Sequence, residues 1–115
     1  MLENAMPFLE RTLFIISEQS KTPVNIKIYE PTLQTERHFF CQFTIDWPSD
    51  PDNGKAYGVD SVQTLQLCFN MIAVHLYTSS FHKEGRLVWE QLGDGYGFAL
   101  GRNVRDLAQG ADKLL

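Results

Sequence analysis

Residues 57–82 read YGVDSVQTLQLCFNMIAVHLYTSSFH, and this stretch decides the fold. From Ser61 to its end it contains no Asp, Glu, Lys or Arg. Asp60 is a favoured helix N-cap, and Gln63 follows three residues later, where a capping box has its second member. The pattern predicts one long helix over roughly residues 60–81. Because this helix is uncharged, other parts of the chain or a partner must cover it.

Two apolar sets share this helix. At about 100° per residue, the larger set forms a stripe that we expect to pack on a sheet, with Cys68 and Ala73 at its margins. It consists of Val62, Leu65, Phe69, Ile72 and Leu76. The smaller set lies nearly opposite and consists of Leu67, Met71 and Val74. It is either a second layer of the core, covered by the C-terminal segment, or a face for self-association or a partner.

The residues on both sides of the helix indicate β-strands. Val24, Ile26 and Ile28 alternate with polar residues, as expected when one face of a strand is buried. The short polar linker 18–22 predicts a hairpin between the first two strands. We expect strands over residues 11–17, from Pro23 to about Pro31, over 37–47 and over 86–91. These elements predict an α+β fold, with a mostly antiparallel sheet of four or five strands and one long helix packed on one face.

Three segments have the composition of loops or irregular structure. Residues 48–55 carry two prolines and an Asn-Gly pair, which makes them the plainest loop of the chain. Residues 93–98 form a glycine-rich turn, which no obvious helix follows as a phosphate-binding loop would require. Residues 101–115 are ambiguous and could form a short amphipathic helix, which Gly110 would weaken.

Length and charge narrow the classes of function. With 115 residues, the chain is predicted to be a single domain over 1–115, with 1–7 and 101–115 peripheral or flexible. The 10 basic and 14 acidic residues give a net charge of −4, which argues against nucleic-acid binding. The start lacks the pattern of a signal peptide, so we expect a cytoplasmic protein with Cys41 and Cys68 reduced. A membrane span is not expected, because the uncharged stretch contains Gln63, Gln66, Asn70 and His75.

The sequence contains no catalytic or metal-binding constellation. Asp60 and Ser61 stand about 20 Å along the helix from His75, too far apart to act as a hydrolase triad. Cys68 and His75 share a helix face but lie about 10 Å apart, too far to chelate one ion. We therefore predict no catalytic residues, no metal and no cofactor.

The stretch from Asp46 to Asp52 is the candidate partner-binding site. It places three acidic side chains around Trp47, and its two prolines stiffen it. Its order does not match a calcium-binding EF-hand loop, so a solvated loop is the simplest interpretation. The functional interpretation is a docking surface for a basic protein, because aromatic residues dominate interface energetics. Its residues are Asp46, Trp47, Asp50 and Asp52.

The combination of Gly58-Val59-Asp60-Ser61-Val62-Gln63, Leu87-Val88-Trp89 and Gly95-Tyr96-Gly97-Phe98 resembles a family of small bacterial domains of unknown function, DUF6968. The resemblance spans roughly residues 8–99 and leaves the C-terminal extension outside. It implies a bacterial origin and a compact α+β domain, and it assigns no catalytic residue.

Small acidic bacterial proteins of this type are often immunity proteins, which bind and neutralise a toxin. Our leading hypothesis is therefore a non-enzymatic protein-interaction domain, most concretely an immunity protein with a basic toxin as partner. The alternative is a self-associating structural or regulatory domain, possible as a homodimer through Leu67, Met71 and Val74. A third class is a small-molecule enzyme or binder with a pocket that uses His75, Tyr77 or Trp89.

Overall fold

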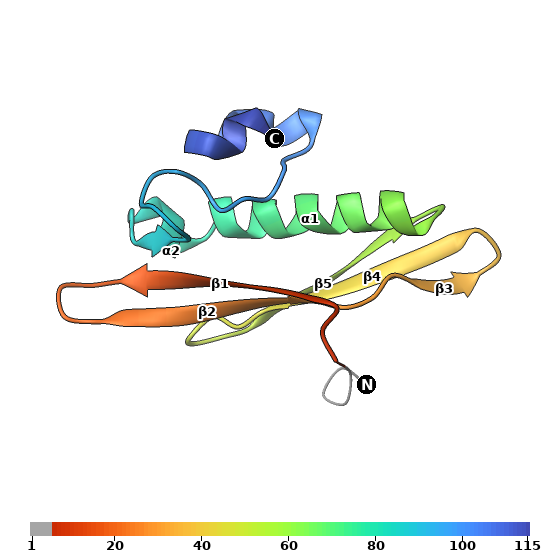
Figure 1. Cartoon of the computed structure of the whole chain (residues 1–115), viewed down its shortest axis with the longest axis horizontal. Coiled ribbons are helices and arrows are strands. Elements are labelled where there is room, and N and C mark those ends of the chain that lie inside the picture. The colour runs from red at the N-terminus through yellow and green to blue at the C-terminus, as the bar shows by residue number, and fades with distance from the viewer. Residues whose placement is uncertain (1–5) are drawn as a thin grey trace. The chain divides into compact units, whose positions relative to one another are not determined.

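The fold is that of a computed structural model, which describes residues 6–115. It is an α+β fold in which one long helix packs against a mostly antiparallel sheet of six strands (Figure 1). The strand order is β3-β4-β2-β1-β6, and β5 pairs with β4 outside this path. The elements are β1 (Leu9–Ile16), β2 (Lys21–Ile28), β3 (Thr32–Thr35), β4 (His38–Ile45), β5 (Asp52–Gly58), α1 (Ser61–Tyr77), α2 (Ser80–Lys83), β6 (Leu87–Val88) and the 3₁₀ helices η2 (Arg102–Leu107) and η3 (Gly110–Leu114). The predicted fold class is confirmed.

The described residues form two compact units. Unit 1 contains Asn25–Cys68 and the described residues up to Arg11, and unit 2 contains Thr12–Val24 and Phe69–Leu115. The elements β1, β2 and α1 each contribute residues to both units.

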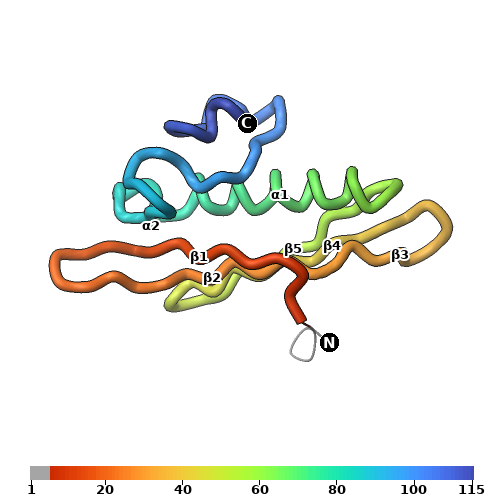
Figure 2. Tube along the Cα trace, viewed as in Figure 1, coloured from red at the N-terminus to blue at the C-terminus, as the bar shows by residue number. Residues whose placement is uncertain are grey.

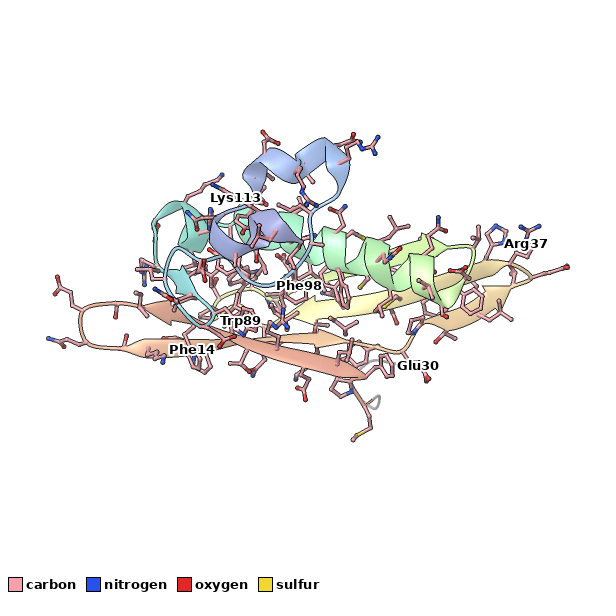
Figure 3. All side chains as sticks on the ribbon, turned by 45° about the horizontal axis from the view of Figure 1, so that its top comes forward. Phe14, Glu30, Arg37, Trp89, Phe98 and Lys113 are labelled. Atoms are coloured by element: carbon pink, nitrogen blue, oxygen red, sulfur yellow. The ribbon has the colours of Figure 1, made fainter. Side chains whose placement is uncertain are left out.

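In unit 1, β4 is the central strand. Its partners are antiparallel: β5 from Phe39↔Gly58 to Ile45↔Asp52, β2 from Ile28↔Phe43 to Ile26↔Ile45, and β3 from Thr32↔Phe40 to Thr35↔His38. Cys41, Phe43 and Ile45 on β4 are buried, as their alternation predicted. The turn before β4 contains Arg37 at φ 66°, and Figure 3 shows its side chain pointing away from the end of the hairpin.

Two predictions for unit 1 were wrong. The sequence predicted no strand over Thr32–Thr35, but β3 forms there on the edge of β4. The predicted loop over 48–55 is a loop only up to Pro51, because Asp52–Lys55 belong to β5. The Asn53-Gly54 pair lies in a strand opposite Thr44 and Phe43, so pairing with β4 overrides its turn preference.

The start of α1 is capped as predicted. The Asp60 carboxylate accepts from the Gln63 backbone N–H at 2.8 Å. The Gln63 side chain accepts from the backbone N–H of Val59 at 2.8 Å, one residue before the position that a capping box uses. The N–H group of Gln63, which has no partner within the helix, is thereby satisfied, and so is that of Val59, which precedes the helix.

The buried face of α1 differs from the predicted stripe. Val62 is 65% exposed, and Leu65 and Phe69 are only half-buried. The residues assigned to the margins, Cys68 and Ala73, are fully buried instead. The buried row runs in steps of four through Thr64, Cys68, Ile72 and Leu76. Thr64 can be buried because its hydroxyl donates to the Asp60 carbonyl at 2.6 Å, a pairing that hydrophobic periodicity does not detect.

The helix is also shorter than predicted. It ends at Tyr77, and the extended backbone of Ser79 begins a second helix, α2. The Ser79 hydroxyl donates to the Leu76 carbonyl at 2.7 Å and accepts from the His82 N–H at 3.2 Å. One serine therefore closes α1 and caps α2.

In unit 2, residues 12–16 of β1 and 21–24 of β2 are the arms of the hairpin that the sequence predicted (Figure 2). In the turn between them, the Ser17 N–H donates to the Ser20 carbonyl at 3.0 Å. β6 pairs antiparallel with β1 through Phe14↔Val88 and Ile15↔Leu87. The predicted strand over 86–91 is correct only for Leu87–Val88. The following segment turns at Gly93, Gly95 and Gly97, all with positive φ, in agreement with the predicted glycine-rich turn.

The C-terminal segment forms two 3₁₀ helices instead of one amphipathic helix. Residues 108–109 separate η2 from η3. Gly110, the first residue of η3, has φ 57°, and a side chain there would overlap the backbone of Asp94. Within the C-terminal segment 101–115, Ala108 and Asp112 are buried. Within residues 6–115, none of the helices has both the length and the apolar character that crossing a membrane requires. Of residues 1–7, which were predicted to be peripheral or flexible, residues 1–5 lie outside the described residues.

Candidate functional site

The predicted partner-binding residues lie at the turn between β4 and β5. The Trp47 indole N–H donates to Asp52 Oδ2 at 2.9 Å, across the turn. Asp46 Oδ2 lies 3.4 Å from Lys27 Nζ, and the Asp46 N–H donates to the Asn25 carbonyl at 2.9 Å. Asp50 is exposed at the tip. The structure therefore brings Trp47 and Asp52 together, joins Asp46 to β2, and leaves Asp50 projecting.

These contacts fix the shape of the turn. Trp47 is half-buried, so its ring is less accessible than the sequence indicated. The Lys27–Asp46 pair is partly exposed, at 35% and 41%, and is worth roughly 0–1 kcal/mol because water screens it. We call residues 46–52 the acidic turn.

A second surface of unit 1 is an apolar hollow at the start of α1. It has a volume of about 430 Å³ and is lined by Phe8, Glu30, Pro31, Phe39, Ser61, Val62 and Leu65. Phe8 is 53% exposed and Val62 is 65% exposed, although both are large and apolar. The acidic turn and this hollow lie near opposite ends of β5, about 20 Å apart at roughly 3.3 Å per residue.

The predicted self-association residues are all partly accessible. Leu67 is 41% exposed, whereas Met71 and Val74 are half-buried.

The residues considered for catalysis or metal binding have structural surroundings. Asp60 caps α1, and Ser61 is exposed in the first turn of that helix. His75 is half-buried on α1. Among the described residues, no three His, Cys, Asp or Glu side chains are placed to hold a metal ion.

Cys41 and Cys68 form a buried thiol pair in unit 1. Both are free cysteines without exposed surface. The Cys41 thiol donates to the Tyr29 carbonyl at 3.2 Å. A hydrogen bond with Cys41, together with burial, raises the pKa of the Cys68 thiol above its ordinary value. Cys68 therefore remains a protonated thiol and not a nucleophilic thiolate.

Sequence reasoning missed the most polar buried group of unit 2, the Asp112 carboxylate, which is only 2% exposed. Its Oδ2 accepts from the Tyr77 hydroxyl at 2.6 Å and from the Tyr96 N–H at 2.8 Å. Its Oδ1 accepts from the Gly97 N–H at 2.7 Å. Three donors thus replace the water that the carboxylate loses on burial.

Two tyrosines lie beside this carboxylate, and a histidine bonds to one of them. Burial, and then the hydrogen bond to Asp112, raise the pKa of Tyr77 above its ordinary value. Burial and the charge of Asp112 raise the pKa of Tyr96 in the same way. The Tyr96 hydroxyl bonds to His82 Nδ1, and burial lowers the pKa of His82. At neutral pH the phenols are therefore donors and the imidazole is uncharged.

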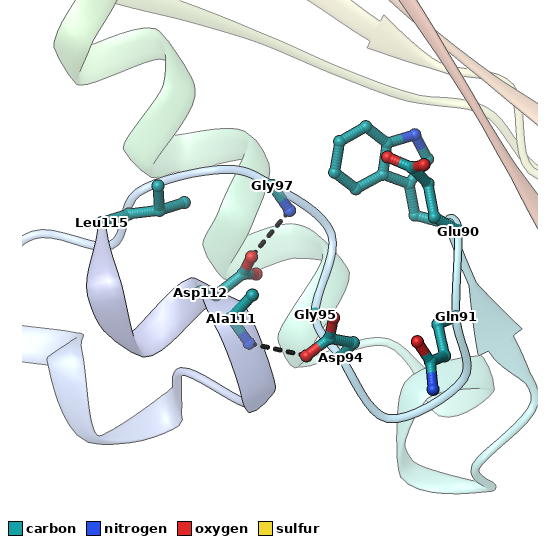
Figure 4. A pocket seen from close by; sticks show the side chains of 9 residues that line it. Glu90, Gln91, Asp94, Gly95, Gly97, Ala111, Asp112 and Leu115 are labelled. Atoms are coloured by element: carbon teal, nitrogen blue, oxygen red, sulfur yellow. Dashed lines mark hydrogen bonds between the residues drawn. The ribbon is translucent and has the colours of Figure 1, made fainter.

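A cavity of about 430 Å³ opens beside Asp112 (Figure 4). Its lining is Trp89, Glu90, Gln91, Asp94, Gly95, Gly97, Ala111, Asp112 and Leu115. Of the residues proposed for a small-molecule pocket, Trp89 lines this cavity and Tyr77 bonds to Asp112, whereas His75 is not part of the lining. The glycines around Tyr96 were the sequence signal that another group approaches this turn closely. No residue pattern near Asp112 indicated that its carboxylate is this group.

A family model for a domain of unknown function, DUF6968, matches residues 9–100. Searches of the curated proteins and of the solved structures find no match. The chain belongs to the DUF6968 family, as the resemblance of its motifs indicated.

Proposed function

We propose that this chain is a non-enzymatic protein-interaction domain, and most concretely a bacterial immunity protein that binds and neutralises a cognate toxin in the cytoplasm. It acts by occlusion, covering a basic patch of the toxin with the acidic turn. A family of unknown function neither supports nor opposes this proposal, so the support comes from the surface itself.

The observation that carries the proposal is the fixed geometry of the acidic turn. The Trp47–Asp52 hydrogen bond orients one of its carboxylates before any partner arrives, and the partly exposed Lys27–Asp46 pair adds a weak constraint on a second. A preorganised surface loses less conformational entropy on binding than a mobile loop does. Asp50 is exposed at the tip, where it can meet a cation of the partner. The net charge of −4 adds long-range attraction to a basic protein.

Co-expression with the toxin encoded beside its gene tests the function. The proposal predicts that cells survive when the chain is present, and that the purified proteins form a complex. Toxicity that is unchanged by the chain would contradict the immunity function.

Charge reversal at the tip tests the surface. Asp50→Lys should weaken toxin binding by about tenfold, mainly through slower association, because a rim charge acts on the encounter rate. Asp106→Lys is the matched control, since Asp106 is also exposed but lies in η2. Equal affinities of the two variants would show that the acidic turn is not the contact.

Self-association is the second candidate function, and the exposure of Leu67 favours it. A leucine that is 41% exposed on a helix gains stability from a second apolar surface. If this face makes a homodimer, sedimentation will show dimers that Leu67→Asp dissociates. Leu107→Asp is the control, because Leu107 is 37% exposed in η2. A monomer at every concentration would rule out this function.

A further inference from the structure

The surroundings of Asp112 have the geometry of a ligand site. Three donors from two separate segments converge on one carboxylate: the Tyr77 hydroxyl at the end of α1, and the N–H groups of Tyr96 and Gly97 in the glycine-rich turn. Gly95 lets the turn approach closely, because a Cβ at that position would overlap the Asp112 carboxyl group. We call these three donors the carboxylate seat.

The seat and its occupant belong to different parts of the chain. Tyr77, Tyr96 and Gly97 lie within the residues that match the family, 9–100, whereas Asp112 lies in the segment beyond them. The family domain thus provides all three donors, and the C-terminal segment provides the acceptor. Asp112 occupies the seat as a ligand would.

We propose that the carboxylate seat is a binding site for a small, singly charged carboxylate, and that Asp112 occupies it in cis. A ligand competes with Asp112 for the site, so the C-terminal segment acts as a built-in competitor.

Three features support this assignment. The seat borders the cavity of about 430 Å³, which gives room for the body of a ligand. Glu90 and Asp94 also line that cavity, and their charges oppose a second negative group on the ligand. The raised pKa of Tyr77 keeps its hydroxyl a donor over a wide pH range. The site therefore favours a monocarboxylate.

Polar contacts other than those of Asp112 also hold the segment near the seat. The Gln109 N–H donates to the Tyr77 hydroxyl at 3.1 Å, and the Ala111 N–H donates to Asp94 Oδ1 at 2.9 Å. Both use backbone N–H groups, so they remain possible when the Asp112 side chain is removed.

Chemical rescue of Asp112→Ala in the full chain tests the proposal. This variant empties the seat, and formate or acetate at neutral pH should fill it. We expect each sodium salt to raise the melting temperature of the variant by about 6 °C at ten times its dissociation constant, relative to sodium chloride of equal ionic strength. The wild-type chain should show a smaller difference at the same concentrations, because Asp112 competes with the ligand for the seat.

Asp106→Ala is the matched control, because Asp106 is an exposed acid outside the seat. Adding Tyr77→Phe to Asp112→Ala removes one donor and should weaken the rescue. Equal shifts of Asp112→Ala in formate and chloride would overturn the proposal. So would a formate shift in the wild-type chain or in Asp106→Ala that is as large as the shift in Asp112→Ala. If Asp112→Ala does not fold in chloride, recovery of its circular dichroism in formate supports the proposal, and recovery in neither salt overturns it.

Discussion

At the scale of single residues, the entry into α1 depends on the close contact between Gly58 and Thr64. A Cβ at Gly58 would lie 2.8 Å from the Thr64 backbone nitrogen and 3.0 Å from its Cα. These are backbone atoms of a buried residue, so they cannot move aside as a flexible side chain could. The glycine of the Gly-Val-Asp motif is therefore required by packing.

Gly58→Ala should destabilise the chain by about 1–3 kcal/mol, the usual cost of overpacking. Urea denaturation followed by circular dichroism measures this change. Val59→Ala is the control and should fall within about 0.5 kcal/mol of wild type, because Val59 is 54% exposed. Equal stability of Gly58→Ala and wild type would contradict the packing argument.

His82 should make stability depend on pH. Burial lowers its pKa in the folded state, so the unfolded chain binds the proton more readily. The contribution of neutral His82 is present above the unfolded pKa of about 6.5 and is lost as pH falls towards the folded pKa. Once His82 is protonated, its Nδ1 can bond to the Tyr96 hydroxyl only as a donor.

The free energy of unfolding should therefore fall as the pH drops below about 6.5, and it should fall less in His82→Gln. Denaturant titrations of both proteins at each pH measure the difference. The same fall in both would mean that other groups cause the pH dependence.

At the scale of elements, the alternation of β4 predicted its buried face, but β3 gave no such signal. All four residues of β3 are exposed, so no hydrophobic pattern marks them. The turn residues of β5 concealed a strand that exists because seven of its residues pair with β4. In both cases tertiary pairing, and not local preference, creates the strand.

The helix start was predictable because a cap is a local interaction, between Asp60 and Gln63. The exact buried row was not, since apolar periodicity fixes a helix face only to within a fraction of a turn. The candidate acidic turn was located from composition. The carboxylate seat was not, because the burial of Asp112 depends on Tyr77, 35 residues away in sequence.

A pair of alanine substitutions tests the corrected helix face. Ile72→Ala should cost about 2–5 kcal/mol, because Ile72 has no exposed surface. Val62→Ala should change stability by less than about 0.5 kcal/mol, because Val62 is 65% exposed. Thermal or urea unfolding compares them. Similar losses of stability at both positions would show that Val62 is packed in the core, as the periodicity predicted.

At the scale of the whole molecule, the fold class and the family follow from sequence motifs, whereas the function depends on surfaces. Unit 1 carries the acidic turn and the apolar hollow, and unit 2 carries the carboxylate seat. The proposed toxin contact and the proposed ligand site therefore use separate residues. Variants at Asp50 and at Asp112 can test them independently.

Hydrogen–deuterium exchange of the chain, alone and saturated with the proposed toxin, tests the central claim most directly. The claim predicts slower exchange in residues 46–52 of the complex, because the toxin covers the acidic turn and excludes water from its backbone. Unchanged exchange in the acidic turn, with protection elsewhere in the complex or nowhere, would contradict it.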